Sequence, residues 1–137
     1  MSATEIRKAL VDEFRRVLKD EPEEVAIFNG LPAFVDGEEE LPAVSVHLSD
    51  IADDDEFLDD PKWRAVLHVA VFVKSSAPDS TLDHWASRLV FPVVPNCREL
   101  LRLCSSIELV GCTYDRSDVA ATWAAIDVKY NITFEWE

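Results

Sequence analysis

Residues 28–48 read FNGLPAFVDGEEELPAVSVHL, in which three short apolar runs are separated by Asn29-Gly30, by Asp36-Gly37 and by two Leu-Pro-Ala repeats. Asn-Gly is the dipeptide that most readily supplies two successive residues with positive φ, which a tight hairpin turn requires. The strand that ends at Phe28 is therefore expected to reverse into the run that follows Leu31. The whole stretch predicts a compact β-meander.

The last of the three runs alternates strictly between apolar and polar residues. Val44, Val46 and Leu48 are separated by serine and histidine. In a strand this alternation directs one face into the core and the other toward solvent or a partner. No catalytic residue type stands out in the meander, which is a first indication that the chain works by shape and assembly.

A helix is expected before the meander, ending at about Lys19. Its apolar residues share one helical face, with an acidic segment at residues 20–24 ending the helix before the first strand. The residues on that face are Ile6, Leu10, Phe14, Val17 and Leu18.

A polar segment follows the meander. Ser49 to Pro61 read SDIADDDEFLDDP, which is too polar and too interrupted for a core element, so we expect a long, mobile, acidic loop at about residues 49–61. Trp63 to Lys74 then alternate with apolar residues on both faces. This pattern is typical of a central strand. We expect helices to cover one of its sides and a second surface, which the sequence does not identify, to contact the other.

The second half predicts two helices and two strands. One helix begins at Pro78, with Asp79 or Ser80 as its N-cap, and ends at Pro92 or Pro95; a shorter one continues through Cys104. Two strands, at residues 107–114 and 122–136, complete the order α-β-β-β-β-α-α-β-β. We predict an α+β fold in one domain spanning residues 1–137, a mostly antiparallel (mixed) sheet with helices packed on one face.

Composition excludes several classes of protein. The chain has 137 residues, with 27 acidic against 13 basic residues and a net charge of −14, so direct binding to nucleic-acid phosphates is not expected. Neither a membrane-spanning apolar run nor a signal peptide is found, and we expect a cytoplasmic protein. The three cysteines are expected to be reduced, mostly buried thiols.

Motifs for enzyme chemistry are missing from the sequence. The chain has no Gly-x-Ser-x-Gly elbow and no phosphate loop, and it contains only three glycines. Asp83-His84 imitates part of a catalytic triad, but an ordinary exposed histidine is the simpler interpretation. We therefore predict no catalytic residues and no cofactor.

Two places in the sequence are candidate cation sites. The acidic run at residues 53–56 fails the spacing of an EF-hand. Asp79 is the better metal candidate, because a helix start fixes its position, although plain N-capping is the commoner role. Weak Mg²⁺ or Ca²⁺ binding by clustered carboxylates stays open.

Several segments, in order and at matching spacing, resemble a known family. They are Thr4 to Arg7, Phe28 to Ala33, Leu41 to Val44, Trp63 to His68 with Val71-Phe72, Pro78 to Asp83 with Trp85, Pro92-Val93, Asp115-Arg116 with Asp118, Trp123, Asp127 and Tyr130 to Glu135. Together they resemble the lambda-type phage tail terminator family, the minor tail protein U of long-tailed phages. The chain departs from the family's pattern in residues 20–24 and in the region after Leu103.

The resemblance implies a structural assembly protein. Its members look like monomers that form a hexameric ring on a completed tail tube, stopping polymerisation and presenting the surface to which the head attaches. The implied partners are further copies of the chain, the tail tube protein and a head-completion (connector) protein, while DNA only passes through the lumen. The implied locations are the host cytoplasm during assembly and the virion tail.

Six copies at −14 each would carry −84, so charge repulsion is expected to oppose ring closure until a tube, salt or divalent cations offset it. Weak Mg²⁺ dependence of oligomerisation follows.

Ten residues are candidates for the interfaces. The acidic loop is expected to order on a tube or head partner. The start of the helix at Pro78 and the connection between the last two strands, at residues 115–118, are candidates for subunit contacts. The loop contributes Asp53, Asp54, Asp55, Glu56 and Phe57; the other candidates are Asp79, Asp83, Asp115, Arg116 and Asp118. Arg116 is equally suited to pairing with a neighbour's carboxylate or with one of its own chain.

Two other functions compete with assembly. One is an acidic protein-binding module that mimics nucleic acid and inhibits a basic partner; against it, the carboxylates cluster in loops rather than along a regular convex face. The other is a hydrolase that uses Asp83 and His84, which would need a nucleophile close by in space.

Overall fold

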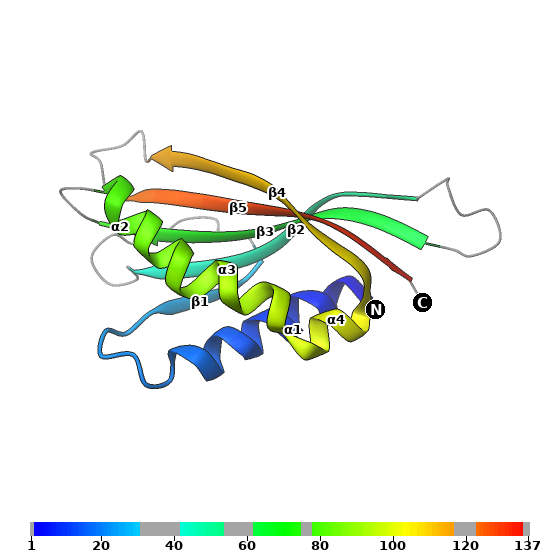
Figure 1. Cartoon of the computed structure of the whole chain (residues 1–137), viewed down its shortest axis with the longest axis horizontal. Helices are drawn as coiled ribbons and strands as arrows, with labels where there is room; N and C mark the ends of the chain where they lie inside the picture. Colours follow the sequence, from blue (N-terminus) through cyan, green and yellow to red (C-terminus); the bar gives the residue numbers. More distant parts are fainter. Residues whose placement is uncertain (1, 31–41, 54–61, 75–77, 117–122, 136–137) are drawn as a thin grey trace.

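The computed structural model describes residues 2–30, 42–53, 62–74, 78–116 and 123–135 (Figure 1). Helices and strands combine in an α+β fold, as the sequence predicts. They are α1 (Ser2–Leu18), β1 (Ala26–Asn29), β2 (Ala43–Asp53), β3 (Lys62–Val73), α2 (Pro78–Trp85), the π-helical turn η1 (Ala86–Val90), α3 (Phe91–Val93), the 3-10 turn η2 (Val94–Asn96), α4 (Arg98–Leu103), β4 (Cys104–Arg116) and β5 (Ala124–Glu135).

The five strands form one sheet in the order β1-β2-β3-β5-β4. β1 runs parallel to β2, and every other neighbouring pair is antiparallel. The helices lie on one side of this sheet (Figure 1). The predicted mixed, mostly antiparallel sheet with helices on one face is therefore confirmed.

A continuous apolar core fills the space between the helices and the sheet. Ile6, Leu10 and Phe14 of α1 are fully buried there, together with Leu67 and other residues of the central strands. Burying one such side chain stabilises the fold by about 1.5–3 kcal/mol. Val17, which the sequence places on the same helical face, is 39% exposed, so that part of the prediction is wrong.

The predicted hairpin at Asn29-Gly30 is wrong. Asn29 is the last residue of β1 and pairs with Val46, and of the dipeptide only Gly30 has a positive φ, of 104°. The Gly30 amide donates to the Val46 carbonyl oxygen over 2.7 Å. Parallel pairing with β2 keeps Asn29 extended, and a type I′ turn needs positive φ at both residues. The middle run of the expected meander, at residues 31–41, lies outside the described residues.

The expected loop at residues 49–61 is wrong for its first part. β2 continues to Asp53, which pairs with Trp63 across an irregularity between Ser49 and Ala52. Asp50, inside that bulge, has φ 54°. A bulge at a sheet edge accommodates polar, exposed residues, so the polar composition of this segment wrongly predicted a loop. Residues 54–61 lie outside the described residues.

The helical region runs nearly without interruption from Pro78 to Asn96. Its π-helical turn is closed by the Phe91 amide, which donates to the carbonyl of Ala86. The expected end at Pro92 or Pro95 is close to the observed one. Cys104, expected in a helix, instead begins the 13-residue strand β4, which is five residues longer than predicted.

Candidate assembly surface

A polar network lies on the face of the sheet that the helices leave open. The rings of His47 and His68 stack with centroids 4.2 Å apart. Nε2 of His68 lies 2.6 Å from Oγ of Ser49, and its Nδ1 lies 2.9 Å from Oδ2 of Asp127. The network joins β2, β3 and β5 across the open face.

Ser49, His68 and Asp127 share the order of contacts of a serine hydrolase triad. The Ser49 hydroxyl also lies 3.2 Å from a carboxylate oxygen of Asp50. A carboxylate beside the hydroxyl opposes the negative charge that acyl transfer develops there. The arrangement therefore suits a structural network that ties three strands together.

The sequence did not reveal this network, because its members come from three strands far apart in the chain. Only the register, which places His47 opposite His68 and Ala70 opposite Asp127, brings them together. Burial, followed by repulsion from His68, lowers the pKa of His47, and Asp127 partly opposes that effect.

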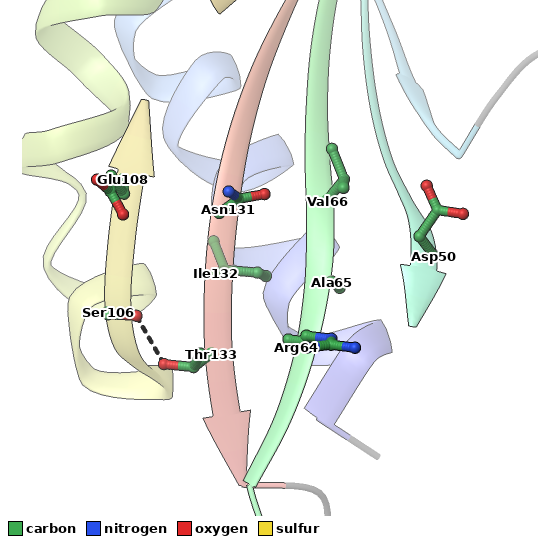
Figure 2. Close-up of a pocket in the computed structure, with 9 residues that line it drawn as sticks. All are labelled: Asp50, Arg64, Ala65, Val66, Ser106, Glu108, Asn131, Ile132 and Thr133. Atoms are coloured by element: carbon green, nitrogen blue, oxygen red, sulfur yellow. Dashed lines mark hydrogen bonds between the residues drawn. The ribbon is translucent and has the colours of Figure 1, made fainter. Parts of the chain in front are cut away.

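A polar pocket of about 470 Å³ lies farther along the sheet. Figure 2 shows its lining residues on four neighbouring strands, including Asp50, Arg64, Glu108 and Asn131. Carboxylates, a guanidinium and an amide are all present, and the pocket is therefore suited to polar groups of either charge.

Three of the predicted interface residues lie together where α2 meets the end of β4. Nη2 of Arg116 lies 3.4 Å from Oδ1 of Asp79, and the Tyr114 hydroxyl donates to Asp83. Arg116 thus pairs within its own chain, one of the two alternatives that the sequence left open. Both partners are more than half exposed, so the pair contributes little to stability.

The other candidates lie elsewhere. Asp115 pairs with Ala125 and therefore points to the opposite face from Arg116, while Asp53 lies at the end of β2. Asp54, Asp55, Glu56, Phe57 and Asp118 are outside the described residues. That any of the ten forms an interface stays a prediction.

Tyr114 was not singled out from the sequence. Its hydrogen bond to Asp83, which favours the neutral phenol, raises its pKa to about 12. The alternation of β4 could have placed Tyr114 on the helix side, but only the sheet order shows that α2 lies beside it.

Within the described ranges, no three His, Cys, Asp or Glu side chains are grouped to hold a metal ion. The cation candidate Asp79 has Arg116 beside it. All three thiols are free; Cys97 and Cys104 are buried and Cys112 is exposed. Burial raises the pKa of Cys104 to about 12, which keeps that thiol protonated.

Of the helices in the described part of the chain, none is long and apolar enough to cross a membrane.

An apolar groove of about 380 Å³ lies between the helices and β4, at the edge of the sheet. Its lining residues are Phe91, Pro95, Leu101, Ile107, Leu109 and Tyr130. Leu101 is 50% exposed and Leu109 51%. We call this feature the β4 groove. The sequence predicts a strand here but does not show that it lies at an edge.

The family model of phage minor tail protein U matches residues 1–134, which include every described helix and nearly all of the last strand. The chain belongs to the minor tail protein U family. It is 36% identical over 135 residues to the tail tube terminator protein of Escherichia phage lambda, and 35% identical over 135 residues to that of Escherichia phage N15. Each alignment covers 98% of this chain and 99% of the relative.

The family match extends over both surfaces described above. In this chain the charged contacts of α2 with β4 and the β4 groove lie on the helix side of the sheet, and the histidine network lies on the other. The resemblance stated from the sequence is confirmed.

Proposed function

We propose that this protein ends the phage tail. Six copies form a ring that caps the tail tube, stops its polymerisation and presents the surface to which the head attaches. One observation carries the proposal: the identity of 35–36% to two proteins named tail tube terminator runs over almost the full length of both chains. The match is thus to a whole protein rather than to a shared subdomain.

The exposed surface of one copy is consistent with assembly. Among the described strands, β4 has a neighbour on one side only, so along 13 residues its outer edge can accept another chain. Leu109 and Val110 of this strand are 51% and 57% exposed. Exposed apolar residues on a sheet edge are typical of a contact surface.

The net charge of each copy would regulate assembly of the proposed ring. With −14 on every copy, six copies repel one another, and salt or Mg²⁺ would screen that repulsion. A soluble copy would then stay single until the tube end holds several copies in register. Ring formation in solution should therefore strengthen as Mg²⁺ is added and weaken with chelator.

Elongating tail tubes test the proposal directly. The purified protein is added to tubes growing from purified tube subunits, and tube lengths and end structures are measured by electron microscopy. We expect growth to stop with about six copies at one end of each tube. An unrelated acidic protein of similar net charge is the control. If growth stopped only because the tube subunits bind any polyanion, this control protein would stop it as well.

Head joining is tested separately. Capped and uncapped tubes are mixed with completed heads, and joined particles are counted. Joining only to capped tubes supports the second role. Tubes that keep growing at an unchanged rate beside an excess of the protein would overturn the terminator function.

A further inference from the structure

The two edges of the sheet carry complementary features. β1 pairs only with residues 43–46 of β2, so among the described strands the far half of β2 is itself an edge. The β4 groove lies at the opposite edge. Two different surfaces on opposite edges can join copies head to tail, which is the arrangement that produces rings or filaments.

The far half of β2 presents an apolar side chain between two carboxylates. Ile51 is 37% exposed and sits in the bulge between Ser49 and Ala52. Asp50 in the same bulge has φ 54°, a conformation uncommon for a residue with a side chain. Bulges re-aim side chains, and this one places Ile51 at the surface although β2 is otherwise apolar on one face.

The β4 groove offers the matching chemistry. Leu101 of α4 lies on its wall, with Arg98 three residues before and Arg102 one residue after. Both arginines are exposed; Arg102 pairs with Glu99, whereas Arg98 makes no ion pair with the part of the chain that the structure describes. In a chain of net charge −14, an apolar groove beside two arginines suits an acidic, apolar partner.

The two features cannot meet within one copy. From β2 to β4 the sheet advances by three strand spacings, about 14 Å, and β3 and β5 fill that interval. Asp53, at the end of β2, is exposed and likewise has no ion pair among the described residues. Unpaired charges of opposite sign at opposite edges therefore favour a second copy of this chain as the occupant.

We propose that Ile51 of one copy seats in the β4 groove of the next, with Asp53 facing Arg98. The contact rests on the proposed ring function and supplies its subunit interface. Because the two surfaces differ, each copy uses one to bind its left neighbour and the other to bind its right. Closure after six copies leaves no surface of either kind free.

The first test replaces apolar contact residues by aspartate. Ile51→Asp and Leu109→Asp are compared with the wild type by sedimentation velocity over a range of concentrations with Mg²⁺. We expect the half-assembly concentration to rise at least about tenfold, because an unpaired charge enters an apolar contact. Val17→Asp, at an exposed valine of α1, is the matched control and should change it less than about twofold. Circular dichroism confirms that all variants fold.

The second test exchanges charges. Asp53→Arg and Arg98→Asp should each weaken assembly, and the double variant should recover most of the loss. A double variant weaker than both single variants contradicts the facing of these two residues. Salt should reduce the effect of each single change.

The third test traps the contact. Ile51→Cys and Leu109→Cys are placed on separate chains in a Cys112→Ser background, since Cys112 is an exposed thiol on β4. Oxidation of the mixture should give mixed dimers in excess of those from Val17→Cys with Leu109→Cys. Equal yields overturn the contact whether or not rings form.

The outcomes separate the two proposals. A wild-type chain that neither caps tubes nor assembles removes the terminator function. A wild-type chain that caps tubes, beside an Ile51→Asp variant that assembles at the same concentration, removes this contact and leaves the function in place.

Discussion

The two faces of the sheet are built from the same strands and do different work. In β3, Leu67 points into the helix-covered core and is fully buried, while its neighbour His68 points to the open face and joins a polar network. The covered face is apolar along its length, whereas the open face combines a small apolar cluster with hydrogen-bonded polar groups. One face supplies most of the apolar burial, and the other ties β2, β3 and β5 together through directional hydrogen bonds.

The largest expected effect separates two adjacent residues of β3. Leu67→Ala should destabilise the protein by about 2–5 kcal/mol, since it leaves a cavity in the core. Val66→Ala, on the partly exposed open face, should cost under about 1 kcal/mol. Urea unfolding measures both. Equal losses would mean that the open face is as tightly packed as the covered one.

A smaller effect is expected for the polar network. Asp127→Ala removes the partner of Nδ1 of His68, whose side chain is only 13% exposed, and should cost about 1–3 kcal/mol. Asn131→Ala, an exposed residue of the same strand and face, is the control and should cost under about 0.5 kcal/mol. Chemical denaturation gives both values. An Asp127→Ala variant with an unchanged free energy of unfolding would show that the network contributes nothing to stability.

Acidification should weaken the open face. The pKa of His47 is lowered below its ordinary value of 6.5, so the unfolded chain binds a proton more readily than the folded one. Stability therefore falls as the pH drops below about 6.5, and this contribution levels off once the pH is below the lowered pKa. Urea midpoints between pH 8 and pH 5 measure the slope. His47→Gln should reduce it.

The smallest expected effect concerns ionisation alone. The chain has two tyrosines, and both have a pKa of about 12, Tyr114 through its hydrogen bond to Asp83 and Tyr130 through burial. Asp83→Asn should return Tyr114 toward its ordinary value of 10 and leave Tyr130 unchanged. In an ultraviolet titration, half of the phenolate signal should shift to lower pH, with circular dichroism marking the range in which the protein stays folded. A shift of the whole signal, or of none, contradicts the assignment.

Much of the fold could be predicted from local patterns. The alternation of β3 and β5 and the apolar face of α1 reflect burial on one side of an element, which single sequences record well. Asn29-Gly30 and residues 49–53 show the limit. A dipeptide that can adopt positive φ permits a hairpin, and a polar composition permits a loop, but neither requires one. Pairing of β1 with β2, and of β2 with β3, determines the structure of these two segments.

The candidate surface was predicted less completely. Asp79, Asp83 and Arg116 were named for local reasons, at a helix start and in a connection, and the fold brings them together. The histidine network, Tyr114 and the β4 groove were missed, because each depends on which strands are neighbours. The order of the strands depends on pairing between residues far apart in the chain, so no short stretch of sequence predicts it.

The order of strands also bears on synthesis in the cell. β5, the last described strand along the chain, lies between β3 and β4 and pairs with both over nearly its whole length. While a ribosome has yet to release this strand, β3 lacks one neighbour and β4 has none, so the sheet cannot form its final edges. The late, non-local pairing is intrinsically slow. A chain truncated before β5 would thus be unable to complete the sheet.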